Sequence, residues 1–329
     1  MVIIMEWYHI LLIIFSSIIL LFFLILLFCF FKCFYAFNKN DSKIFIPEGK
    51  QYEKFRPLIL KDIETADNME YINYEIKSFD NLTLKARYYE YEKGAPIEIM
   101  FHGYKGNSRR DMSSGIKRAF ACHRNALLID QRASGNSEGR VITFGINESK
   151  DCLSWINFVI DTFGPDCKII LTGISMGAAT VMNASNYDLP KNVVGVLADC
   201  GFDSAKNIII KTIKEMKLPP KVFYPFVKLS AKIFWRFNIE ETSPIQAVKN
   251  AKVPIIFMHG TDDKMVPCQM SINLYENCNN TKKLVLIENA GHGIAYLVES
   301  EKYINELNDF YNEKTLNLNW CLSSRQLNN

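Results

Sequence analysis

An uncharged apolar run near the amino terminus constrains this chain more than any other feature. Residues 10–31 read ILLIIFSSIILLFFLILLFCFF, in which Ser16 and Ser17 are the only clearly polar residues. As a helix this run is about 33 Å long, enough to cross a hydrocarbon core of about 30 Å. It has no polar stripe, which a helix of a soluble protein would normally show. We therefore expect residues 1–32 to form a permanent single-pass membrane anchor.

A cleaved signal peptide is the main alternative for this segment. Such a peptide carries Lys or Arg before a shorter apolar run and small residues after it. Here residues 1–9 contain neither Lys nor Arg. The apolar run ends in Phe-Phe and is followed by Lys-Cys-Phe-Tyr rather than by a run of small residues. The positive-inside rule predicts a cytoplasmic body, because four lysines follow the apolar run: Lys32, Lys39, Lys43 and Lys50.

The composition is that of a packed globular protein, with 49% hydrophobic and 22% charged residues, which excludes wholesale disorder. The net charge of +3 comes without a dense Lys/Arg run, so we expect no nucleic-acid partner. Nine cysteines are scattered without C-x-x-C or other ligand spacing. We therefore expect neither a metal site nor a disulfide scaffold.

Strand and helix patterns alternate along most of the chain. Alternating apolar residues around Asp80-Asn81 predict a hairpin over 71–91. Mostly apolar strands then alternate with helical segments, as in a parallel sheet covered on both faces. The expected strands are 97–101, 126–129, 168–172, 193–197, 253–258 and 283–287, and a last helix is expected over 296–311.

These patterns divide the chain into parts. We expect one α/β core made of residues 70–203 and 251–315, interrupted by a helical insertion at 204–250. Residues 33–69 are expected to be a stalk or a short helical preface. Residues 316–329 are polar and Asn-rich, and we expect a frayed tail there.

A candidate nucleophile lies in Gly173-Ile174-Ser175-Met176-Gly177, between an apolar strand and an Ala-rich helix. A nucleophile elbow needs this context, because small residues must flank so sharp a turn and the serine hydroxyl is then held at the carboxyl end of the strand. An ordinary strand-to-helix turn is the alternative.

A serine hydroxyl needs a base to take its proton. His292 follows the last expected strand in Ala290-Gly291-His292-Gly293, after the acid candidates, as the order Ser, Asp, His requires. A solvent-facing loop histidine is the alternative. His102 is expected to brace its own loop.

Three carboxylates could orient this histidine and stabilise its charge. We prefer Asp263, in the stretch His259-Gly260-Thr261-Asp262-Asp263, because its spacing to Val266-Pro267 leaves it at the tip of the turn. Asp262 and Asp199 are the alternatives, and Asp199 ends the strand before the insertion.

An oxyanion formed at a substrate carbonyl needs hydrogen-bond donors. The backbone N–H of Met176, directly after the serine, is one candidate. The N–H of Tyr104 is the other, in the loop after residue 101, where Gly103 permits close backbone approach.

Five segments in this order resemble the α/β-hydrolase superfamily. They are Phe101-His102-Gly103-Tyr104, Asp130-Gln131-Arg132-Ala133-Ser134-Gly135-Asn136-Ser137-Glu138-Gly139, the Ser175 and Asp263 segments quoted above, and Gly291-His292-Gly293. The chain is most similar to bacterial membrane-anchored hydrolases of the serine aminopeptidase/prolyl-oligopeptidase-like branch. Members usually carry His where Ser134 stands, a departure that affects loop packing. The resemblance implies an eight-stranded, mostly parallel sheet, a lid at 204–250, and Ser175, Asp263 and His292 as a catalytic triad.

We expect a serine hydrolase that cleaves a carboxylic ester or thioester through an acyl-enzyme, without a cofactor. The aromatic residues of the insertion either pack it onto the sheet or roof an apolar cleft for an acyl or aryl group. Together with the anchor, such a cleft indicates a small-molecule or lipid-like acyl substrate. A serine peptidase or amidase, and a non-catalytic scaffold at the membrane, remain alternatives.

Overall fold

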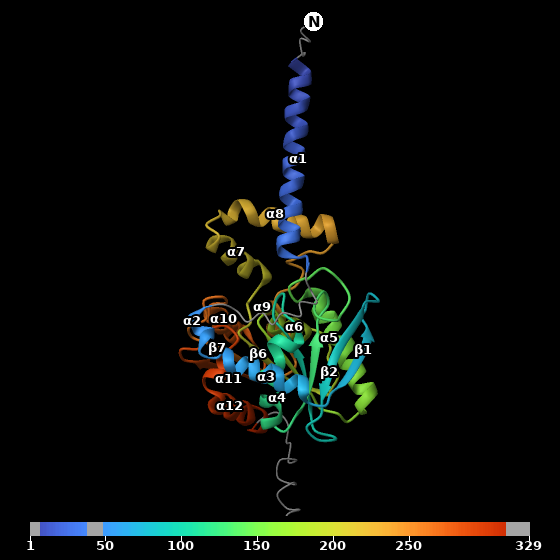
Figure 1. Cartoon of the computed structure of the whole chain (residues 1–329), viewed down its shortest axis with the longest axis vertical. Coiled ribbons are helices and arrows are strands. Elements are labelled where there is room, and N and C mark those ends of the chain that lie inside the picture. The colour runs from blue at the N-terminus through green and yellow to red at the C-terminus, as the bar shows by residue number, and fades with distance from the viewer. Residues whose placement is uncertain (1–6, 38–48, 314–329) are drawn as a thin grey trace, which may run out of the picture.

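The structure is a computed structural model that describes residues 7–37 and 49–313. A long helix, α1 (Trp7–Cys33), projects from an α/β body (Figure 1). The tail expected at 316–329 lies outside the described residues, as do residues 38–48 of the expected stalk.

One sheet of eight strands forms the body, in the order β1-β2-β4-β3-β5-β6-β7-β8. Strand β2 runs antiparallel to both of its neighbours, and every other pair of adjacent strands in the sheet is parallel. The expected hairpin and the mostly parallel eight-stranded sheet are therefore confirmed. The strands are β1 (Ile72–Lys77), β2 (Thr83–Tyr89), β3 (Ile97–Phe101), β4 (Asn125–Asp130), β5 (Ile169–Ile174), β6 (Val193–Asp199), β7 (Ile255–Gly260) and β8 (Lys282–Ile287).

Helices cover both faces of this sheet (Figure 1). Every residue of β3, β4 and β7 is buried, which explains why the sequence shows continuous apolar strands rather than alternation. The helices on one face are α5 (Ile146–Phe163), α6 (Met176–Ala184), α9 (Pro244–Asn250) and α10 (Gln269–Asn277). Those on the other are α3 (Arg56–Asn68), α4 (Ser108–Ala121), α11 (Ala295–Val298) and α12 (Ser300–Glu313). The single helix expected over 296–311 is wrong, because Glu299 leaves helical geometry (φ −134°, ψ 66°) and separates α11 from α12.

The segment that precedes the sheet packs on the body. Helix α2 (Lys50–Glu53) is followed by α3, which lies along α4. Buried Asp62 of α3 accepts a hydrogen bond from the Ser114 hydroxyl (2.7 Å) and pairs with Lys117 of α4. For the described residues 49–69 the helical preface is therefore the correct alternative, and the stalk is not.

The insertion contains α7 (Ala205–Glu215) and α8 (Pro220–Trp235) before α9 returns to the sheet. Helix α8 lies crosswise at the base of α1 (Figure 1). Phenylalanine rings join the two helices, with ring centroids 5.5 Å apart for Phe22 and Phe226 and 5.4 Å apart for Phe30 and Phe234. The insertion therefore contacts the apolar helix as well as the body.

His102, directly after β3, braces the loop that follows it. The ring is fully buried; Nδ1 lies 2.8 Å from the Gly103 carbonyl oxygen and Nε2 lies 3.1 Å from the Gln131 backbone nitrogen. The carbonyl only accepts and the amide only donates, so the neutral tautomer with the proton on Nδ1 satisfies both partners. Burial lowers the pKa of His102, which keeps the ring neutral.

We predict that this histidine makes the protein less stable in mild acid. In the unfolded chain this histidine has a pKa of about 6.5, and in the folded protein its pKa is lower. Below about pH 6.5 the unfolded chain therefore takes up a proton more readily than the folded protein, and the free energy of unfolding falls. The free energy of unfolding, measured with urea, should therefore fall between pH 7.5 and pH 5.5, and His102→Gln should reduce this fall. The exposed His123 gives a matched control, since His123→Gln should keep the full wild-type fall. An equal fall in all three proteins would contradict the assignment.

Candidate active site

Ser175 lies on a very tight turn between β5 and α6. Its backbone has φ 56° and ψ −115°, a strained conformation for a residue with a side chain. A Cβ on Gly177 would lie 1.9 Å from the Phe101 carbonyl oxygen, and a Cβ on Gly173 would lie 2.1 Å from the Gly177 carbonyl carbon. Only glycine fits at both positions, as a nucleophile elbow requires.

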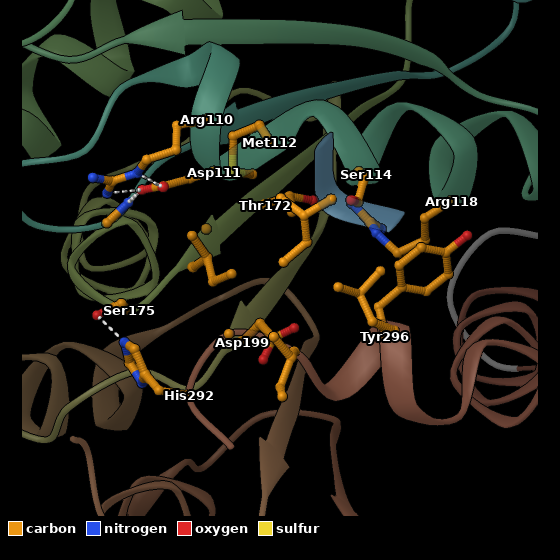
Figure 2. Close-up of a pocket in the computed structure, with 18 of the residues that line it drawn as sticks. Arg110, Asp111, Met112, Ser114, Arg118, Thr172, Ser175, Asp199, His292 and Tyr296 are labelled. Carbon is orange, nitrogen blue, oxygen red and sulfur yellow. Dashed lines mark hydrogen bonds and ion pairs between the residues drawn. The ribbon is translucent and has the colours of Figure 1, made fainter. Parts of the chain in front are cut away.

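The structure brings Ser175, His292 and Asp263 together. His292 Nε2 lies 2.9 Å from Ser175 Oγ (Figure 2), and His292 Nδ1 lies 2.7 Å from Asp263 Oδ2. A carboxylate accepts hydrogen bonds, so the shared proton belongs on Nδ1 and Nε2 is left to accept from the serine hydroxyl. This is the arrangement in which an imidazole can take a proton from a nucleophile.

Asp263 is held as an ion. Burial by itself would raise its pKa, but hydrogen bonds from His259 and His292 outweigh burial, so the pKa of Asp263 lies well below its ordinary value. The backbone N–H groups of Met265 and Val266 donate to the other carboxylate oxygen, each at 2.8 Å. The carboxylate can therefore stabilise a positive charge that develops on His292.

The two alternative acids are placed elsewhere. Asp262 is exposed, and its backbone N–H donates to the Ala290 carbonyl oxygen (3.0 Å). Asp199 Oδ2 accepts from the Tyr303 hydroxyl (2.7 Å). Of the three candidates, Asp263 is the one hydrogen-bonded to His292.

His259 and Tyr52 hold parts of this arrangement and were not expected from the sequence. His259 Nε2 lies 3.2 Å from Asp263 Oδ2 and 2.8 Å from the Val266 carbonyl oxygen, so a proton on this nitrogen fixes the acid turn. The four-residue spacing of His259 and Asp263 was a signal available in the sequence.

Tyr52 of α2 donates its hydroxyl proton to the His292 carbonyl oxygen (2.9 Å). No local pattern could have indicated this contact, which joins residues 240 positions apart.

Two adjacent residues at the start of the loop after β3 are held by hydrogen bonds to other elements. The Gly103 N–H donates to Asp111 Oδ2 of α4 (3.0 Å), and the Tyr104 hydroxyl donates to the Cys33 carbonyl oxygen at the end of α1 (2.7 Å). Met176 begins α6, where first-turn N–H groups have no partner within the helix. The two expected oxyanion donors thus come from a fixed loop and a helix start, which suits a preorganised site.

A cavity of about 370 Å³ opens from Ser175 and His292. It extends over the sheet face that carries α4 and α11, as far as Arg118, Thr172 and Asp199 (Figure 2). Tyr52 and Ile59 line it from the amino-terminal helices α2 and α3. None of the insertion residues 204–250 lines this cavity, so of the two alternatives for their aromatic rings, the one in which they roof the cavity does not hold.

One group of side chains could in principle hold a metal ion. Ligand atoms of Cys200, Asp263 and His292 all lie within 4.8 Å of one another. Burial raises the pKa of the Cys200 thiol well above its ordinary value, so the sulfur keeps its proton, whereas metals bind the thiolate. The donor set therefore suits proton transfer from Ser175 to His292 better than metal binding.

Comparison with known proteins agrees with this geometry. The model of the prolyl oligopeptidase family matches residues 143–317, more than half of the chain. The protein YqkD of Bacillus subtilis is 25% identical over 187 residues, which cover 56% of this chain and 61% of YqkD. The protein bem46 of Schizosaccharomyces pombe is 27% identical over 228 residues, which cover 66% of this chain and 68% of bem46. The match thus spans about three fifths of the length of YqkD.

Solved structures show the same fold. The esterase Pf2001 of Pyrococcus furiosus has a TM-score of 0.60 at 23% identity and covers 76% of this chain and 94% of its own. The α/β hydrolase GrgF of a Penicillium species has a TM-score of 0.60 at 15% identity and covers 74% of this chain and 98% of its own. With the eight-stranded sheet and the Ser175 turn, these findings show that the chain has the α/β-hydrolase fold and belongs to the prolyl oligopeptidase family.

Proposed function

We propose that this hydrolase cleaves a carboxylic ester or thioester through an acyl-enzyme formed on Ser175. The observation that carries the proposal is the continuous hydrogen-bonded chain from Ser175 Oγ through His292 to Asp263. Ser175 Oγ attacks the carbonyl carbon while His292 Nε2 takes the hydroxyl proton, and Asp263 stabilises the imidazolium. The carbonyl oxygen becomes an oxyanion, which the N–H groups of Met176 and Tyr104 hold.

Two further steps complete the reaction. The oxyanion re-forms the carbonyl as the bond to the leaving group breaks, and His292 gives its proton to the departing oxygen or sulfur. Water then attacks the acyl-enzyme while His292 takes one of its protons. When the Ser175 ester bond breaks, that proton returns to Oγ and the carboxylic acid leaves.

The two arginines of the cavity favour an ester or thioester over a peptide. Arg110 is paired with Asp111, and Arg118 is paired with Glu98, so neither guanidinium is left alone to bind a peptide carboxylate. The structural relative Pf2001 is itself named an esterase. The family name supports the second candidate, a peptidase or amidase. Comparing p-nitrophenyl esters of rising chain length with aminoacyl and peptidyl p-nitroanilides distinguishes the two.

We predict that a fluorophosphonate probe labels the wild-type protein and does not label Ser175→Ala. Asp263→Asn should lower kcat for a p-nitrophenyl ester by about 10⁴-fold, because Asn favours the wrong imidazole tautomer. The adjacent Asp262→Asn is the matched control and should keep wild-type kcat, since that side chain is exposed. A wild-type protein that is neither labelled nor active would instead favour the non-catalytic scaffold.

We also propose that α1 stays in the protein as a membrane anchor. By length and composition it could span a bilayer, although a signal sequence would pass the same test. Its carboxyl end is built into the body, where Leu26, Phe30 and Phe34 are at most 5% exposed. The Phe34 ring contacts Phe144 and Phe237, with ring centroids 5.9 and 5.3 Å apart. Cleavage between α1 and the body would expose this apolar surface, which supports retention.

The lid helix α8 suits the surface of a bilayer. Its inner face is buried, whereas Val222, Leu229, Ile233 and Trp235 are exposed. Val222, Leu229 and Ile233 share one helical stripe with Phe226, whose ring packs on Phe22 of α1. Lysines and arginine flank that stripe, as in helices that lie in a membrane interface. They are Lys221, Lys228, Lys232 and Arg236.

The level of this contact along α1 agrees with an interfacial position. Trp7 and Tyr8 begin α1, and aromatic residues of this kind mark one membrane–water interface. A hydrocarbon core of about 30 Å takes about 20 residues and so ends near Leu26. Helix α8 contacts α1 between Phe22 and Phe30, at that same level. We therefore propose that the lid lies in the interface and that the substrate is lipid-like.

We predict that the double variant Leu229→Gln, Ile233→Gln hydrolyses a long-chain ester in anionic vesicles severalfold more slowly than wild type. Polar side chains on the stripe should weaken its insertion. Turnover of a soluble short-chain ester should be unchanged, because these residues do not line the cavity. Ile72→Gln on β1 is the matched control, since that side chain is 50% exposed and Ile233 is 48% exposed. Equal loss on both substrates would count against interfacial insertion.

The body is proposed to lie on the cytoplasmic side, on the strength of the lysines that follow the apolar run. Protease added outside intact cells should then leave the body uncut, and its digestion there would reverse the orientation.

A further inference from the structure

The active-site cavity is lined by a buried carboxylate with one oxygen unused. Asp199 is 7% exposed, and its Oδ2 accepts from the Tyr303 hydroxyl (2.7 Å). Its Oδ1 is buried and has no hydrogen-bond partner among residues 7–37 and 49–313. Asp199 lines the cavity together with Ser175 (Figure 2). A buried acceptor is costly to leave unpaired, so this oxygen is a binding position for a hydrogen-bond donor.

Neighbouring charges define which kind of donor fits. Glu98 accepts from both Arg118 and Arg124, at 2.7 and 2.6 Å, and the Thr172 hydroxyl also lies within reach of it at 3.3 Å. All of these side chains are buried. Two carboxylates, counting Asp199, therefore balance two guanidinium groups. An ammonium group would leave a net positive charge in a buried place, whereas a hydroxyl or amide N–H would not.

Asp199 is also next to the nucleophile in the sheet. The Ser175 N–H donates to the Asp199 carbonyl oxygen (2.8 Å), and Asp199 pairs with Ile174 across β5 and β6. A group at Asp199 Oδ1 thus belongs to the part of the substrate nearest Ser175. This part is best taken as the acyl group. A leaving group held at the buried Asp199 Oδ1 would have to pass the acyl-enzyme in order to depart.

We propose that Asp199 is a specificity-determining residue that accepts a hydrogen bond from a neutral donor, a hydroxyl or amide N–H, on the acyl group of the substrate. This inference rests on the proposed hydrolysis at Ser175. Asp199 does not serve as the catalytic acid, because Asp263 holds His292. Thr172 and Arg118 line the same cavity as Asp199.

Replacing the acceptor at Asp199 Oδ1 with a hydrogen-bond donor tests the subsite. The p-nitrophenyl esters of 3-hydroxybutyrate and 6-hydroxyhexanoate are compared with their methoxy counterparts, which can accept a hydrogen bond but not donate one. For at least one of the two positions, the wild-type enzyme should prefer the hydroxyl ester by about 10- to 100-fold in kcat/KM. In Asp199→Asn the amide oxygen can still accept from Tyr303 and the amide N–H then faces the cavity, so the preference should shift toward the methoxy ester. Asp199→Ala should lose the preference without reversing it.

Controls separate this outcome from a general loss of structure or of activity. Asp188→Asn, which changes an exposed aspartate, should keep the wild-type preference. Fluorophosphonate labelling and turnover of unsubstituted hexanoate report whether each variant keeps a working Ser175. If wild type cleaves hexanoate but treats hydroxyl and methoxy esters alike, or if the preference survives unchanged in Asp199→Asn, the subsite is refuted while the proposed hydrolysis stands. If wild type cleaves no ester and is not labelled, the proposed function itself fails.

Discussion

The close approach of α6 to the end of β3 is the constraint on which the site depends. With no Cβ at Gly177, the first turn of α6 comes within contact of the Phe101 carbonyl, and that contact holds Ser175 in a left-handed conformation. The same approach sets the loop after Phe101 beside the nucleophile. The Ser175 turn and the loop after Phe101 are thus positioned by one packing contact, and a side chain at Gly173 or Gly177 would disturb both.

The sequence was sufficient to locate the three residues that meet at this edge of the sheet. Ser175, Asp263 and His292 each follow a strand of a mostly parallel sheet, and such strand ends lie along one edge. Small residues around Ser175 and His292 gave a local signal that needed no knowledge of distant contacts.

Contacts between distant segments were beyond the reach of such reasoning. Tyr52 and Asp111 act on the site through partners far away along the chain or on another element, and neither lies in a recognisable motif. For the same reason the sequence left open whether the aromatic residues of the insertion roof the cavity or pack elsewhere. The aromatic residues of 204–250 suggested a cover, but Phe226 and Phe234 pack on α1 instead, and the side chains of Tyr52 and Ile59 line the cavity. The composition of a segment indicates that its aromatic rings will be buried, but it does not indicate which surface they pack against.

The hydrogen bonds at the end of α1 have a consequence for how the protein can be divided. The carbonyl oxygens of Lys32 and Cys33, which a helix cannot satisfy internally at its carboxyl end, accept from Lys105 and Tyr104 of the loop after β3. A fragment that starts after Cys33 would therefore deprive that loop of its acceptors and remove Phe30, whose ring packs against Phe34. The α/β body and its apolar helix are thus joined by hydrogen bonds and ring packing, and a soluble version needs new polar surface on α1 rather than a cut behind it.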